Sequence, residues 1–244
     1  MEISERHMAT TTDLKNARRI IVEKNGPYIV TGVPLVRKRQ IVSEYGEPLT
    51  WEKTGDIATD EIYRLCRCGR SQTMPFCDDA HVDSDFDGTE AAPTSTSAER
   101  AQVYTSGTKI VVKRDGSLCM ESGFCGTRLT NIRKMLKDSA EPAVRAQIMA
   151  MSERCPSGSY SYSMEPETPN VEPDLPQQIA VITEMTDAGP IDGPLWVTGS
   201  IEVERADGQP FEARNRVTLC GCGESKIKPL CDGTHRALKK RVAG

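Results

Sequence analysis

The sequence of 244 residues has few of the side chains from which a large core is built. Hydrophobic residues make up 37% and aromatic residues 5%, while 15 prolines and 19 glycines interrupt regular structure. Such a composition does not favour a single large hydrophobic core, so we expect small modules that are stabilised by bound metals or disulfides. The length fits one large domain or two to three small ones.

Several marks of other protein classes are missing. No apolar run approaches the ~20 residues that span a bilayer, and no secretory leader opens the chain. A net charge of −4 argues against a nucleic-acid partner. There is no Gly-rich phosphate loop and no nucleophile elbow, and His7, outside the cysteine clusters, is expected to bind nothing. We therefore expect neither a membrane nor a nucleic-acid partner, and a protein that is not an enzyme.

Cysteine is the residue that stands out. The nine cysteines are an odd number, and their Cys-x-Cys pairs lie too close together for a simple disulfide framework. Clustered cysteine with histidine in a chain without a leader favours metal ligation in a reducing compartment, here the cytoplasm.

Two of the three cysteine clusters are near copies of each other. The 17 residues that begin at Leu65 align without a gap with those that begin at Leu219, and nine positions are identical. Each copy supplies three thiolates and one imidazole at the same spacing, which is a complete ligand set for a metal centre. The candidate ligands are Cys66, Cys68, Cys77 and His81 in the first copy, and Cys220, Cys222, Cys231 and His235 in the second.

The repeat extends upstream of the cysteines. Residues 26–32 and 193–199 share five of seven positions, and each segment combines a Gly-Pro turn with a short β-branched strand. The pattern predicts one supersecondary unit used twice, with a longer insertion at 37–61 in the first copy.

Between the repeats lies a different module. Residues 108–113 read as a strand because of their β-branched run, and Leu129, Ile132 and Leu136 have helical spacing. A second helical pattern ends before Cys155-Pro156, and an alternating strand follows. These last two predictions rest on Val144, Ile148 and Met151 for the helix and on Tyr160, Tyr162 and Met164 for the strand.

Three cysteines and one histidine bind zinc as readily as they bind an iron–sulfur cluster, so ligand identity alone leaves both open. The spacing favours the cluster, because all four ligands fall within 16 residues and such a short loop wraps one compact object.

The pattern Cys-x-Cys-x2-Ser-x3-Pro-x-Cys-Asp-Gly-Thr-His at 220–235 resembles the CDGSH iron–sulfur family. The resemblance implies that the three cysteines and the histidine of each copy bind a 2Fe–2S cluster. It also implies that two units pack as a dimer, here within one chain, so a monomer is plausible. The first copy departs from the pattern at Asp79, where the family has glycine; all its ligands remain, so we expect a cluster there too.

Cys119, Cys125 and Cys155 form a second pattern, which resembles single-cluster ferredoxins. Ser122 stands where the four-cysteine version has another cysteine. Three ligands favour a 3Fe–4S cluster over a 4Fe–4S cluster that takes Ser122, water or another group as its last ligand. A degenerate domain without a cluster is the alternative.

The expected fold is α+β: two small β-rich CDGSH units that form an intramolecular pseudo-dimer, plus a ferredoxin-like insert. Electron transfer through three clusters, two of them flanking a ferredoxin-like centre, is the expected function. The alternatives are cluster storage, transfer or redox sensing, and a zinc-stapled interaction module. The partner would be a redox protein or an apo iron–sulfur acceptor.

The expected boundaries are an arm at 1–18, the first unit at 19–90, a linker at 91–107, the ferredoxin-like domain at 108–164, a Pro-rich connection at 165–190 and the second unit at 191–244.

Overall fold

A computed structural model of the chain describes residues 18–238. The arm expected at 1–18 therefore lies outside the described residues except for Arg18, as do the last residues of the second unit. The fold is α+β, as predicted, with three sheets and short helices. Among residues 18–238, none of the helices is long and apolar enough to cross a bilayer.

Two of the sheets belong to the repeated units. Sheet A has the order β11-β1-β2-β5, and sheet B has the order β12-β10-β9-β3-β4. The strands of sheet A are β1 (Arg19–Val22), β2 (Tyr28–Thr31), β5 (Ile62–Leu65) and β11 (Glu202–Glu204). Those of sheet B are β3 (Leu35–Val42), β4 (Pro48–Ile57), β9 (Gln178–Thr186), β10 (Gly189–Thr198) and β12 (Arg216–Leu219).

Each unit contributes to the sheet of the other: the first unit gives β3 and β4 to sheet B, and the second unit gives β11 to sheet A. Strand β3 of the first unit runs parallel to β9 of the second, with Leu35 opposite Ile179. Strand β11 of the second unit runs parallel to β1 of the first, with Arg19 opposite Glu202. The exchange gives the intramolecular pseudo-dimer that the repeat predicts.

The exchanged strands bury one shared core. Its side chains come from both copies, so each unit removes apolar surface of the other from water. The completely buried members include Ile20, Tyr28, Val30 and Leu65 from the first unit and Ile179, Val197 and Leu219 from the second.

The middle module combines a sheet with helices. Sheet C has the order β6-β7-β8, and helix α4 confirms the helical pattern around Ile148. The predicted strand at 108–113 begins only at Val111, and Leu129 is 88% exposed in a turn that Thr127 and Thr130 close, so Leu129 does not belong to the buried helix face. The elements are β6 (Gln102–Tyr104), β7 (Val111–Arg114), η1 (Gly116–Leu118), α3 (Ile132–Met135), η2 (Leu136–Asp138), α4 (Pro142–Glu153) and β8 (Tyr160–Ser163).

Two stretches expected as connections contain regular structure. The expected linker at 91–107 holds α2 (Ser97–Arg100), whose first turn is closed by a capping box between Thr96 and Glu99, and β6. The expected Pro-rich connection at 165–190 holds β9, which is central in sheet B. The prolines before it end at Pro176, and the β-branched run that follows forms a strand.

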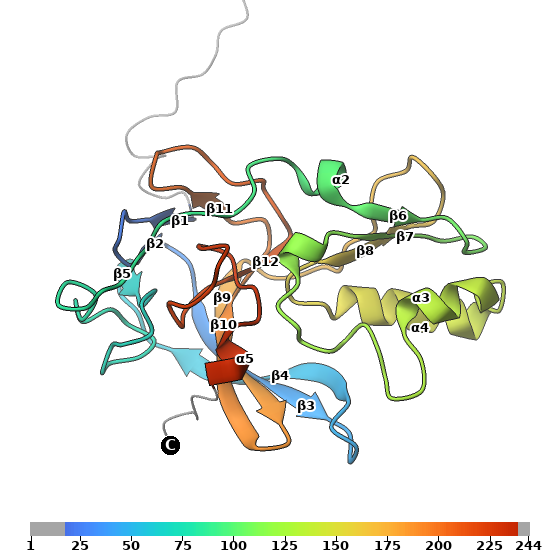
Figure 1. Cartoon of the computed structure of the whole chain (residues 1–244), viewed down its shortest axis with the longest axis horizontal. Helices are drawn as coiled ribbons and strands as arrows, with labels where there is room; N and C mark the ends of the chain where they lie inside the picture. Colours follow the sequence, from blue (N-terminus) through green and yellow to red (C-terminus); the bar gives the residue numbers. More distant parts are fainter. Residues whose placement is uncertain (1–17, 239–244) are drawn as a thin grey trace, which may run out of the picture.

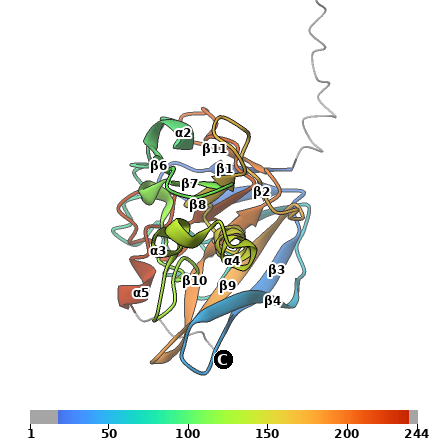
Figure 2. The same cartoon turned by 90° about the vertical axis from the view of Figure 1, so that its right-hand side faces the viewer.

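The order of the units in space differs from their order in the sequence. In Figure 1 the second unit, with β12, β10 and α5 (His235–Leu238), lies between β5 of the first unit and the helices of the middle module. Figure 2 is the view from the side on which α3 and α4 lie. The ferredoxin-like module is therefore at one end of the molecule and not at its centre.

Candidate metal centres

The two ligand loops are built by the same hydrogen bonds. The amide of Cys66 donates to the carbonyl of Pro75 at 2.8 Å, and that of Cys220 donates to Pro229 at 2.7 Å. Both prolines follow cis peptide bonds. In each copy an aspartate accepts from the amide two residues on, Ala80 to Asp78 at 3.1 Å and Thr234 to Asp232 at 3.0 Å. A helix follows only in the second copy, where α5 begins at His235.

The four predicted ligands of each copy come together in two pairs. The Sγ atoms of the Cys-x-Cys pair are 3.7 Å apart in both copies. The third cysteine meets the histidine, with Sγ to Nδ1 distances of 3.5 Å for Cys77–His81 and 3.3 Å for Cys231–His235.

These separations match ligands that share one metal ion. With metal–sulfur bonds of ~2.3 Å and metal–nitrogen bonds of ~2.0 Å, a tetrahedral ion has sulfur–sulfur edges of ~3.8 Å and sulfur–nitrogen edges of ~3.5 Å. One ion would hold all four ligand atoms within such edges. Among residues 18–238, however, the group of three or more ligand atoms found within 4.8 Å of one another is Cys77, Asp79 and His81. This group lacks Cys66 and Cys68, so within the described residues neither copy brings its four ligand atoms together, and each copy fits two metal ions, one for each pair, better than one.

In each loop, burial opposes the thiolate form of at least one cysteine. It raises the pKa of Cys68 to about 11, and it also raises the pKa of Cys231. The thiol of Cys222 donates to Cys220, which lowers the pKa of Cys220 to about 6 and raises that of Cys222. A bound cation removes this conflict, because thiolates are the form that ligates metals. Both loops therefore fit a metal centre.

The two ligand loops pack against each other through their backbones. A Cβ atom on Gly69 would overlap the backbone of Cys222, and one on Gly223 would overlap the backbone of Cys68. Both glycines have positive φ, 69° and 83°. The two sites are therefore direct neighbours.

The second site has partners that the sequence analysis missed. The carboxylate of Glu184 is fully buried; its Oε1 lies 2.8 Å from His235 Nε2, and its Oε2 pairs with Arg236. Tyr28 of the first unit donates to the carbonyl of Cys220 at 2.8 Å. The sequence held one signal for Glu184: it alternates in register with Ala180 and Ile182 on the buried face of β9.

The first site is more open. Cys77 and His81 are half-buried, whereas Cys231 and His235 are 2% and 4% exposed. Asp79, the departure from the repeat, has φ 67° and pairs with Arg64. Its counterpart Gly233 has φ 87°, and a Cβ there would lie 3.1 Å from the carbonyl oxygen of Met120 in the middle module. The copies differ here because the second loop touches a neighbouring module.

This contact predicts unequal effects when each copy receives the residue that the other copy has at the equivalent position. Gly233→Asp should destabilise the chain by about 2 kcal/mol and disturb the middle site, because the new side chain pushes against the Met120 backbone. Asp79→Gly removes only an exposed ion pair, worth about 0–1 kcal/mol. Urea unfolding of both variants measures the difference, and equal effects would contradict the contact.

The predicted ligands of the middle site also approach one another. Burial raises the pKa of Cys125, and the neighbouring Cys155 and Cys119 raise it further. Cys155 is 7% exposed, and Ser122 is 8% exposed within the loop between the other two. The amide of Ile132 at the start of α3 donates to the Cys125 carbonyl at 3.1 Å. These three cysteines, with Ser122 in the same loop, form the candidate middle site.

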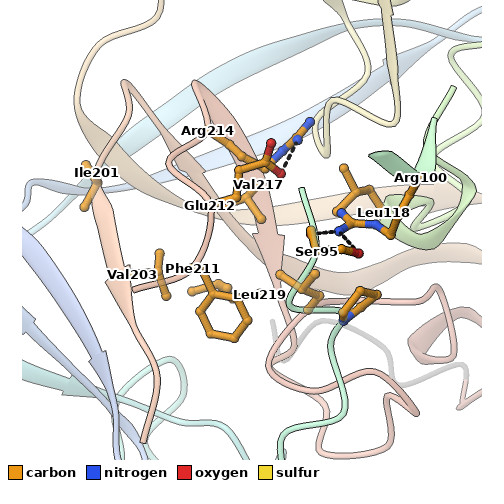
Figure 3. Close-up of a pocket in the computed structure, with 12 residues that line it drawn as sticks. Ser95, Arg100, Leu118, Ile201, Val203, Phe211, Glu212, Arg214, Val217 and Leu219 are labelled. Carbon is orange, nitrogen blue, oxygen red and sulfur yellow. Dashed lines mark hydrogen bonds and ion pairs between the residues drawn. The ribbon is translucent and has the colours of Figure 1, made fainter. Parts of the chain in front are cut away.

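The middle and second sites share an apolar wall. Leu118 precedes Cys119, and Leu219 precedes Cys220; both line a cavity of about 30 Å³ (Figure 3). A volume of this size holds one or two water molecules rather than a substrate. The residues that precede the two ligand loops therefore face the same small cavity.

Comparison with known families supports this arrangement. Residues 25–82 and 192–236 match the family described as an iron-binding zinc finger of CDGSH type. Residues 105–165 match the family described as a divergent 4Fe–4S mono-cluster. Comparison with curated proteins and with solved structures gave no match. The chain therefore contains iron–sulfur-binding regions of two kinds: two CDGSH-type regions that flank, in sequence, a 4Fe–4S-type region. Families of this kind are generally electron carriers or cluster-handling proteins.

Proposed function

We propose that the chain transfers electrons through three iron–sulfur clusters arranged in the order middle, second, first. The observation that carries the proposal is the backbone contact between neighbouring ligand loops. Gly233, two residues from Cys231, touches Met120 beside Cys119, and Gly223 touches Cys68. Electron tunnelling falls steeply with separation, so loops in van der Waals contact give short steps.

The ligand geometry supports a 2Fe–2S cluster in each CDGSH region. Cys66 and Cys68, or Cys220 and Cys222, would hold one iron. The cysteine–histidine pairs Cys77–His81 and Cys231–His235, with separations of 3.5 and 3.3 Å, would hold the other. Imidazole in place of thiolate leaves the cluster less negative, which eases its reduction.

The middle site would hold a 3Fe–4S cluster on Cys119, Cys125 and Cys155, or a 4Fe–4S cluster if Ser122 or water supplies the last ligand. Burial raises the pKa of Cys125, and the nearby Cys155 and Cys119 raise it further, which supports the convergence of the three thiols on one centre. A redox protein is the partner that this function requires.

Cluster donation is a second candidate, which the openness of the first site favours. His81 is half-buried, and its ring makes a hydrogen bond only through Nδ1, to Cys77, among the residues that the structure describes. A cluster bound by this half-buried histidine would be accessible to an apo iron–sulfur acceptor.

Two mixtures of the reduced holo-protein, one with an oxidised holo-ferredoxin and one with an apo-ferredoxin, separate the two functions. Electron transfer predicts fast, reversible oxidation by the holo-ferredoxin, and all iron kept on the chain in the mixture with the apo-ferredoxin. Iron and sulfide that move to the acceptor, with bleaching of the donor, would contradict it and support cluster donation. Gel filtration and metal analysis of both proteins after mixing give the answer.

A further inference from the structure

The two CDGSH sites differ in what lies behind the histidine. In the second site the imidazole is 4% exposed, and its Nε2 atom faces Glu184 at 2.8 Å. Its Nδ1 atom faces Cys231 Sγ and is the nitrogen placed to bind metal. The first site has the Cys77–His81 contact but, within residues 18–238, no hydrogen bond to Nε2 of His81.

The difference has its origin in hairpin length. Strands β9 and β10 extend to Thr186 and Gly189, so the hairpin carries Glu184 out to His235. The corresponding strands β1 and β2 of the first unit are four residues each and turn between Val22 and Tyr28. Gly193 leaves room for the carboxylate, because a Cβ there would lie 3.2 Å from its Oε1.

A buried carboxylate in this position is costly unless it is paired. Glu184 has two partners, His235 and the guanidinium of Arg236, whose side chain is 30% exposed. A carboxylate behind a metal-binding histidine fixes the ring, sets its tautomer and makes the other nitrogen a stronger donor.

Resting on the proposed function, we propose that Glu184 is a positioning residue for His235 and makes the two CDGSH clusters unequal. It holds the second cluster more firmly than the first and lowers its reduction potential. The first cluster, whose histidine has no carboxylate hydrogen-bonded to Nε2 among the described residues, is the one that is lost sooner and reduced more easily. The chain thus uses one repeated loop for a retained centre inside the molecule and an exchangeable centre at its edge.

Two substitutions separate orientation from charge. Glu184→Ala removes both, so the second cluster should be lost about tenfold faster during a chelator challenge, while the first is unchanged. Glu184→Gln keeps an oxygen that accepts from Nε2–H but removes the charge. In this variant the second cluster should be lost at nearly the same rate as in the parent protein, and the reduction potential of that cluster should rise. Glu52→Gln, an exposed glutamate on β4 of the same sheet, is the control and should change neither.

Visible bleaching and a redox titration followed by electron paramagnetic resonance provide the readouts. Cys66→Ala, which removes a ligand of the first cluster, identifies the signals of the second. If Glu184→Gln and Glu184→Ala leave the second cluster unchanged, or shift both clusters equally, the inference is overturned and the proposed function survives. If the parent protein carries no iron, the proposed function is overturned, and this inference with it.

Discussion

Alanine at Gly223 is expected to destabilise the chain by about 3 kcal/mol or more, because two costs add at this position. The residue has φ 83°, and its Cβ would overlap the carbonyl of Cys68 in the other ligand loop. A left-handed conformation alone costs a non-glycine residue about 1–2 kcal/mol. Overlap with a rigid backbone adds about 1–3 kcal/mol.

Gly208 provides a matched control. It has φ 80°, but nothing lies within 4 Å of a Cβ built there. Gly208→Ala should therefore show only the conformational cost. Urea unfolding and iron content of both variants measure the effect; equal stabilities would show that the two ligand loops do not pack as described.

Removal of the second cluster is expected to isolate the other two from each other. In the parent protein, paramagnetic neighbours should broaden the resonance of the second cluster from both sides. The double variant Cys220→Ala/Cys222→Ala should leave the first and middle clusters with signals of isolated centres and stop electron exchange between them.

The matching variant lacks the first cluster instead. Cys66→Ala/Cys68→Ala should keep the interaction between the middle and second clusters, because Met120 still contacts Gly233. Retained coupling between the first and middle clusters after loss of the second would contradict the proposed order.

The local parts of this molecule could be predicted from the sequence, whereas its long-range pairings could not. Both ligand loops follow from spacing within 16 residues, and the structure brings Cys66 to Cys68 and Cys231 to His235. Helix α4 follows from its apolar period. In each case the interactions that form the feature lie close in sequence.

The strand exchange has no such local signal. Nothing local in residues 35–42 specifies a strand partner, so the pairing of Leu35 with Ile179 could not be read from the sequence. The same holds for Glu184, whose partner His235 is 51 residues away. The position of the middle module beside the second unit also depends on such distant contacts.

The central claim is that the paired ligands hold iron bridged by sulfide. Quantifying iron, acid-labile sulfide and zinc in anaerobically purified protein tests it most directly. We predict about seven irons and about eight sulfides per chain, from two 2Fe–2S clusters and one 3Fe–4S cluster, with negligible zinc. Colourless protein that contains zinc and no sulfide would contradict the account and leave the metal only a structural role.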